Sequence, residues 1–167
     1  MITFRVDSLP VAQPRQQHRI VKTRGGRESV QNYTPANSNV NAFKAAVMAA
    51  AAERIRVPID GPVHLAVGFV MPRPKSKCWK TKPMPRYHHT GKPDLDNLLK
   101  SLKDALTQAN AWRDDSQVTS VTAEKWVAAG NECAHVVVEV HSLRGDLAPA
   151  EAKSTSDTKN RFGNATP

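Results

Sequence analysis

Residues 94–109 carry apolar side chains at a spacing that is typical of an amphipathic helix. They recur every three or four positions and are Leu95, Leu98, Leu99, Leu102, Ala105, Leu106 and Ala109. Because each helical residue turns about 100°, they form one wide apolar stripe. A helix of this kind has one side to bury, so we expect it to cover the core of a folded domain.

Further elements follow from the same periodicity. A helix is predicted over residues 36–55, with Asn37, Ser38 and Asn39 as candidate N-caps and an apolar stripe of Phe43, Ala46, Val47 and Ala50. Alternating or dense apolar patterns predict strands over residues 1–7, 63–71, 116–127 and 134–141. The apolar density of residues 63–71 favours an interior strand. We expect the last two strands to pair through the turn at residues 128–131.

The net charge of the chain indicates which class of molecule it binds. The chain has 167 residues, 24 Lys and Arg against 15 Asp and Glu, and a formal net charge of +9. This excess favours polyanions, with nucleic acid before an anionic membrane surface. The longest uncharged apolar run, residues 45–52, is far too short to cross a bilayer. With no signal-peptide core and two cysteines, the pattern indicates a cytoplasmic protein without membrane contact.

The positive charge is concentrated in two segments. Residues 15–34 are basic and polar around Gly25-Gly26, which suits a hairpin tip or a loop. Residues 72–92 are rich in proline and contain no Asp or Glu. We expect DNA contacts from Arg15, Arg19, Arg73, Lys75, Lys77, Lys80, Lys82, Arg86 and Lys92. Residues 1–142 form the predicted domain, and the composition of residues 143–167 indicates a disordered tail.

The acidic residues near Pro93 are candidates for metal binding and catalysis. Pro93 disfavours helical geometry at the residue before it, so Asp94 can be the N-cap, with Asp96 in the first helical turn. An extended Asp94 can then turn its carboxylate toward the space that Asp96 faces. Lys100 follows Asp96 by four residues, on the same helical face.

A second acidic pair, Asp114-Asp115, lies between the helix and the next predicted strand. If the fold returns this loop to the start of the helix, three or four carboxylates meet beside Lys100. Oxygen ligands of this kind suit Mg²⁺ or Mn²⁺, and the combination suits metal-assisted phosphodiester cleavage. The simpler alternative is that Asp94 caps a helix, Asp96 and Lys100 form a surface pair, and Asp114-Asp115 is a turn.

These motifs together resemble one family. The string Lys92-Pro93-Asp94-Leu95-Asp96-Asn97-Leu98-Leu99-Lys100, followed by Asp114-Asp115-Ser116-Gln117-Val118, is similar to the RusA family of Holliday-junction resolvases. The resemblance is strongest over residues 92–126. In place of an expected glycine turn after the helix, this chain has Ala109-Asn110-Ala111.

The resemblance implies an α+β fold, with a mixed sheet packed against two main helices. It implies a Mg²⁺-dependent endodeoxyribonuclease in which Asp94, Asp96 and Asp115 bind metal, Lys100 is catalytic, and Asp114 is a further candidate ligand. It also implies a bacterial or phage-encoded homodimer that nicks four-way junction DNA symmetrically. The competing hypothesis from the basic surface is a non-catalytic protein that binds junctions or single strands.

Overall fold

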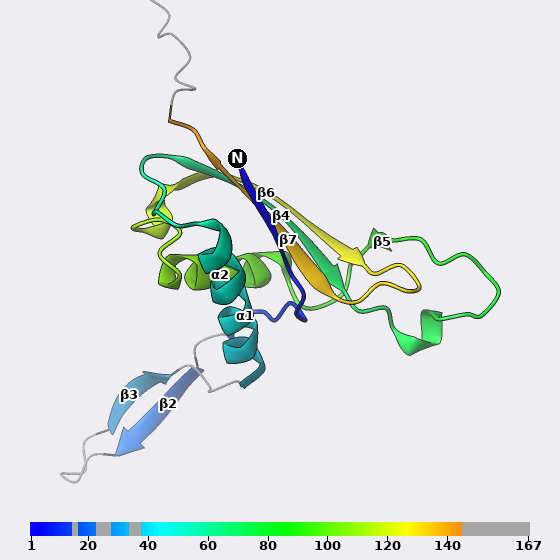
Figure 1. The fold of residues 1–167 in the computed structure, drawn as a ribbon. Helices are drawn as coiled ribbons and strands as arrows, with labels where there is room; N and C mark the ends of the chain where they lie inside the picture. The colour runs from blue at the N-terminus through cyan, green and yellow to red at the C-terminus, as the bar shows by residue number, and fades with distance from the viewer. Residues whose placement is uncertain (15–16, 23–27, 34–37, 145–167) are drawn as a thin grey trace, which may run out of the picture.

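The structure, a computed structural model, describes residues 1–14, 17–22, 28–33 and 38–144 of the chain (Figure 1). The strands are β1 (Ile2–Val6), β2 (Gln17–Lys22), β3 (Glu28–Tyr33), β4 (Val63–Met71), β5 (Tyr87–His88), β6 (Val118–Val127) and β7 (His135–Ser142). The α-helices are α1 (Ser38–Arg54) and α2 (Leu95–Gln108), and two short 3-10 helices are η1 (Lys75–Lys77) and η2 (Asp115–Gln117). The predicted α+β class with two main helices is confirmed.

A five-stranded mixed sheet forms the centre of the molecule. Its strand order is β1-β7-β4-β6-β5, and β4 pairs in parallel with β6 while the other pairs are antiparallel. The interior position predicted for residues 63–71 is confirmed, because β4 lies between β7 and β6. Parallel β4 and β6 need a crossover connection, and that connection carries α2.

The expected pairing of β6 with β7 is wrong. β4 lies between these two strands and pairs with both of them. Residues 128–134 are long enough for this, because an extended chain of that length spans about 20 Å and neighbouring strands are about 4.8 Å apart. Placing the strongly apolar β4 in the middle buries it between two neighbours, which a β6–β7 hairpin would not do.

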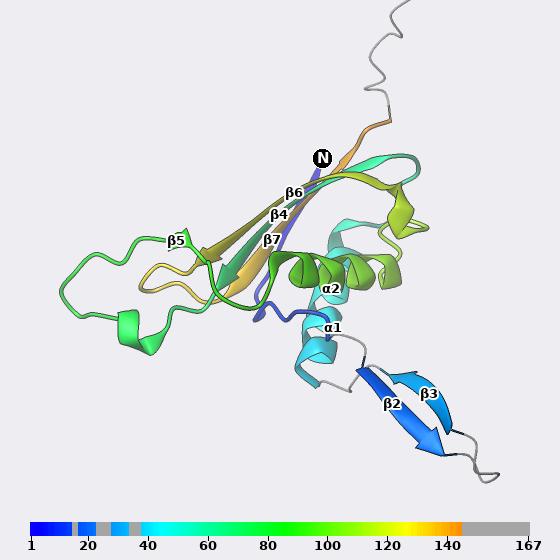
Figure 2. The same ribbon diagram turned by 180° about the vertical axis from the view of Figure 1, so that it is seen from behind.

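Both α-helices cover one face of the sheet, and Figures 1 and 2 show them on the same side. The α2 stripe is confirmed, since Leu98, Leu102, Ala105 and Leu106 are buried in the core. From α1 the buried residues are Val40, Phe43, Val47 and Ala51. These side chains pack against inward residues of β1, β4 and β7, so the core lies between helices and sheet.

Predictions were also made for the basic segment 15–34 and for the tail at residues 143–167. Strands β2 and β3 pair antiparallel as a separate ribbon, and the Gly25-Gly26 tip lies outside the described residues. Of the predicted tail, Leu143 and Arg144 are described: the Leu143 amide donates to the Pro62 carbonyl oxygen, and Arg144 pairs with Asp60 at 2.9 Å.

Across the described ranges, the structure contains no helix with the length and apolar character needed to span a membrane.

Candidate active site

The start of α2 has the geometry that Pro93 predicts. Asp94 is the N-cap, with extended backbone angles (φ −70°, ψ 144°), and Asp96 lies in the first turn. The Asp94 side chain makes no capping hydrogen bond to the helix. Asp94, Asp96 and Lys100 are all exposed to solvent. The carboxylates therefore lie where a ligand can reach them, beside the positive end of the helix dipole.

A cavity opens beside this helix end. Its volume is about 530 Å³, and Lys92, Pro93, Asp94 and Asn97 line it. The backbone amide of Gln13 donates to the Asn97 carbonyl oxygen at 3.0 Å, which ties the segment after β1 to this turn of α2. The cavity combines a cation, a carboxylate and a side-chain amide, a combination able to bind a phosphate together with a metal ion.

Asp115 returns to the same face of α2. Its Oδ2 lies 3.3 Å from the Nζ of Lys103. Lys103 follows Asp96 by seven residues and Lys100 by three, so all three α2 residues share one helical face. The acidic loop therefore reaches the helical face that carries Asp96 and Lys100, but it does so at Lys103, two turns along from Asp96, and not at the start of the helix.

The end of α2 directs the chain into this loop. Asn110 has φ 56°, in the left-handed region that glycine and asparagine tolerate best. The amides of Asn110 and Ala111 donate to the carbonyl oxygens of Thr107 and Leu106, which is the Schellman pattern of helix termination. Asn110 thus replaces the expected glycine. Next in the chain, the buried Trp112 donates its indole N–H to Thr107 at 2.8 Å.

Gln117 fixes the acidic loop through four hydrogen bonds. Its Oε1 accepts from the amides of Arg113 (2.8 Å) and Asp114 (3.2 Å). Its Nε2 donates to the carbonyl oxygens of Ile59 (3.1 Å) and Gly61 (2.9 Å). No role for Gln117 was predicted from the sequence. Its position three residues after Asp114 is the spacing of a capping box, which was the available signal.

Asp114 has a local structural role. Its carboxylate accepts from the Ser116 amide at 2.8 Å and caps η2. Hydrogen bonds from the Ser116 side chain and backbone lower the pKa of Asp114 below its ordinary value. Of the two neighbouring acids, Asp115 is the one that forms an ion pair with α2, through Lys103.

Lys125 on β6 also supports the site, and sequence reasoning missed it. Its Nζ donates to the carbonyl oxygens of Gly91 at 2.7 Å and Pro93 at 2.6 Å. The Lys125 carbonyl oxygen accepts from the His89 amide at 2.9 Å. One residue thus fixes the turn that immediately precedes Asp94. A single lysine in a strand pattern gives no sequence signal for this role.

The carboxylates do not form a closed ligand set. Among residues 1–14, 17–22, 28–33 and 38–144, no three His, Cys, Asp or Glu side chains come together as a metal-binding group. Magnesium fits such an arrangement, because it is commonly bound by one or two carboxylates and completes its coordination with water and substrate phosphate. The exposed oxygen donors of Asp94 and Asp96 next to the cavity meet that requirement.

Some of the predicted DNA-contacting cations are engaged within the protein, and others are exposed to solvent. Arg73 donates to the carbonyl oxygens of Ala128 and Met84, and Arg86 pairs with Glu132, so both are engaged within the protein. Lys77 lies 5.1 Å from the centre of the Tyr87 ring. The lysines at 75, 80, 82 and 92 are exposed. Arg15 lies outside the described residues, and Arg19 is in β2 with its side chain undescribed.

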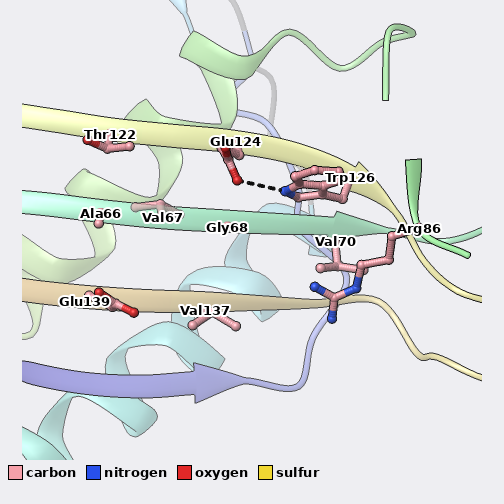
Figure 3. A pocket seen from close by; sticks show the side chains of 10 residues that line it. All are labelled: Ala66, Val67, Gly68, Val70, Arg86, Thr122, Glu124, Trp126, Val137 and Glu139. Atoms are coloured by element: carbon pink, nitrogen blue, oxygen red, sulfur yellow. Dashed lines mark hydrogen bonds between the residues drawn. The ribbon is translucent and has the colours of Figure 1, made fainter. Parts of the chain in front are cut away.

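Figure 3 shows the sheet face that the helices leave uncovered. A hollow of about 320 Å³ lies there over β4, β6 and β7. Trp126 donates to Glu124 at 3.1 Å, and Arg86 reaches over Val70 from the loop before β5. None of the sequence-predicted carboxylates lines this hollow.

Comparison of the sequence with known proteins identifies the family. Residues 9–141 match the family model for endodeoxyribonuclease RusA. The chain is 32% identical over 123 residues to the crossover junction endodeoxyribonuclease rusA of Lactococcus phage r1t, covering 73% of this chain and 84% of that protein. It is also 35% identical over 131 residues to the uncharacterized protein YqaN of Bacillus subtilis strain 168, covering 75% and 87% respectively. The chain therefore belongs to the RusA family of endodeoxyribonucleases.

Proposed function

We propose that this protein resolves four-way DNA junctions by nicking two strands symmetrically, using Mg²⁺, for which Mn²⁺ can substitute. The observation that carries the proposal is the shared face of α2: Asp96 and Lys100 lie on it, and Asp115 reaches it through Lys103. Family membership and the junction-cleaving name of the phage relative support the same activity.

In this proposal Asp94, Asp96 and Asp115 supply carboxylate oxygens to the metal. A divalent ion held by these carboxylates would supply the Lewis acidity that activates water and polarises a phosphate oxygen. Lys100 lies one turn along from Asp96, where its ammonium stabilises negative charge that develops on the phosphate. Lys92 and Asn97 line the adjacent cavity and orient the phosphate that enters it.

We further propose that the protein is bacterial or phage-encoded and acts in the cytoplasm as a homodimer. A four-way junction has approximate two-fold symmetry, and two matched nicks need one site on each side of it. We assign the nuclease domain to residues 1–142 and treat residues 143–167 as a tail outside it. The exposed lysines of the 72–92 segment would follow the DNA phosphates, which makes binding strongly salt-dependent.

The test is cleavage of a synthetic mobile four-way junction in Mg²⁺, in Mn²⁺ and in EDTA, with a flap and a plain duplex as comparison substrates. We expect paired symmetric nicks in Mg²⁺ that disappear in EDTA and in the Asp96→Asn variant. Glu53→Gln is the matched control, because it removes one carboxylate charge from an exposed position on α1, outside α2 and the acidic loop.

The alternative is a junction-binding protein without nuclease activity. The exposed lysines of the 72–92 segment would support binding of this kind without any metal. Tight junction binding with no nicks in either metal would establish this alternative. Faster cleavage of the flap than of the junction would instead retain the metal chemistry and change the substrate.

A further inference from the structure

A further hollow is lined by residues from the middle of the basic segment 72–92. It has a volume of about 900 Å³ and is formed where the loop between β4 and β5 meets the turn between β6 and β7. Figures 1 and 2 show these two loops side by side beyond the ends of β4 and β6. None of its lining residues belongs to α2 or to the acidic loop. It is therefore separate from the candidate active site.

The lining of this hollow combines one exposed aromatic residue with free cations. The Trp79 side chain is 45% exposed, whereas the other tryptophans are buried Trp112 and partly buried Trp126. Lys80 and Lys82 follow Trp79 and also line the hollow. These two lysines make no hydrogen bond or ion pair within the described part of the chain. Their charge is available to a ligand.

The remaining charged groups of the hollow are already paired. Arg86 donates to Glu132 from Nε at 2.8 Å, and Arg5 pairs with Asp7 at 2.6 Å. The Arg86 hydrogen bond lowers the pKa of Glu132 to about 2, so this carboxylate stays ionised and neutralised by its partner. The net charge that the hollow offers to a ligand is therefore that of Lys80 and Lys82.

The position of Trp79 is set by its surroundings. Its backbone amide lies 3.3 Å from the sulfur of Met84. Met84 in turn packs on the turn at Gly130, whose amide donates to the Met84 carbonyl oxygen at 3.0 Å. A Cβ atom at Gly130 would lie within contact distance of the Met84 side chain, so the two loops are closely packed. The indole is thus presented on an anchored loop.

We propose that this hollow binds an unpaired nucleotide of DNA, with the base stacked on Trp79 and the neighbouring phosphates beside Lys80 and Lys82. An exposed indole flanked by unpaired cations is the combination by which proteins bind single strands without reading sequence. A base in duplex DNA has both faces covered by its neighbours, so stacking on Trp79 requires an unstacked nucleotide. The proposal rests on DNA being the substrate.

Binding in EDTA tests the proposal without any cleavage. The probes are a labelled oligothymidine and a duplex of the same length. We expect Trp79→Ala to weaken oligothymidine binding about 10-fold and to leave duplex binding nearly unchanged. Trp79→Phe should retain most of the affinity, since it keeps an aromatic face. The exposed position of Trp79 makes loss of folding a minor concern, and chemical unfolding of each variant checks it.

The salt dependence of oligothymidine binding tests the proposed role of Lys80 and Lys82. The double variant Lys80→Gln with Lys82→Gln should reduce the slope of log K against log salt by about 1.4, the value for two lost phosphate contacts to a single strand. The matched control is Arg54→Gln with Arg56→Gln, which removes the same charge from exposed positions at and just after the end of α1, outside the hollow and outside the 72–92 segment. Equal reductions in the two double variants would contradict a localised site.

Tryptophan emission gives an independent measurement. Oligothymidine should quench the fluorescence of the wild-type protein, and the quenching should be lost in Trp79→Phe but retained in Trp126→Phe. Unchanged oligothymidine affinity in Trp79→Ala would overturn the proposal even if junction cleavage is normal. Failure of junction cleavage with intact Trp79-dependent binding would instead overturn the proposed nuclease function and leave this site standing.

Discussion

The ammonium group of Lys125 on β6 lies 2.6 Å from the carbonyl oxygen of Pro93, one residue before the N-cap of α2. A second hydrogen bond joins it to the carbonyl oxygen of Gly91. Through these bonds the sheet determines where α2 starts, and therefore where the carboxylate of Asp94 lies. A strand residue with no place in the acidic motifs thus positions one of the proposed metal ligands.

Replacing Lys125 should therefore impair catalysis more than DNA binding. Lys125→Met keeps an unbranched side chain that is one atom shorter and removes both hydrogen bonds, so we expect the single-turnover rate of junction cleavage to fall about 10-fold. Raised Mg²⁺ should restore part of the rate, because a displaced ligand weakens metal binding. The measurement is cleavage against Mg²⁺ concentration, alongside binding in EDTA. A normal rate in Lys125→Met would show that Asp94 does not depend on this anchor.

The oxygen and the nitrogen of the Gln117 side-chain amide make different hydrogen bonds, so substitutions at this residue can separate their effects. Gln117→Leu removes the hydrogen bonds to the amides of Arg113 and Asp114 and those to the carbonyl oxygens of Ile59 and Gly61. We expect a loss of about 1–2 kcal/mol in the free energy of unfolding and a clear loss of cleavage. Denaturant unfolding and junction cleavage measure the two effects.

Gln117→Glu separates these contributions, because it retains the acceptor oxygens for the two amides and loses the donor group. We expect it to unfold more easily than wild type while keeping more activity than Gln117→Leu. Equal activity of both variants would mean that the amide contacts do not position Asp115.

Asn110 ends α2 with a positive φ, and its replacement should affect stability according to how well each residue tolerates that conformation. Asn110→Gly should be close to neutral. Asn110→Ala should lower the free energy of unfolding by about 1 kcal/mol, and Asn110→Val should lower it further, because a branched Cβ is most strained in the left-handed region. Thermal unfolding of the three variants checks the order. A more stable Ala variant would contradict the Schellman assignment.

The Arg86–Glu132 pair predicts a pH dependence of stability. The ordinary pKa of 4.5 for Glu132 is lowered to about 2 in the folded protein. The folded state therefore binds the proton more weakly than the unfolded state, so the pair stabilises the fold above pH 4.5 and loses that effect as the pH falls toward 2. Because Arg86 is 44% exposed, we expect a contribution of only about 1 kcal/mol.

Glu132→Gln should accordingly be less stable than wild type at neutral pH, with the difference shrinking between pH 4.5 and pH 2. Urea unfolding at several pH values measures this. A difference that is constant across the range would assign the effect to packing rather than to charge.

Local sequence patterns predicted the helices and strands well, but they did not predict which strands lie next to each other. The apolar stripe of α2, the interior strand β4 and the Asp94 N-cap all depend on residues a few positions apart, where spacing determines which side is buried. The order β7-β4-β6 depends on which strands pair, and alternation indicates the face of a strand but not its partner.

The same limit applies to the site. Sequence spacing places Asp96 and Lys100 on one face, and Lys103 at the next turn was visible in the same pattern. That Asp115 would meet Lys103, or that Lys125 would bond to the turn before Asp94, depends on the path of the chain between β4 and β6. Those contacts join residues that are distant in sequence, and a single sequence carries no record of them.

The crossover from β4 through α2 to β6 has a consequence for how proteins of this kind diversify. The four proposed reactive residues, Asp94, Asp96, Lys100 and Asp115, all fall within the stretch between these two parallel strands. The β2–β3 ribbon and the end of the chain beyond β7 lie outside it. Insertions or deletions in the β2–β3 ribbon or beyond β7 therefore leave the spacing of these four residues along the chain unchanged.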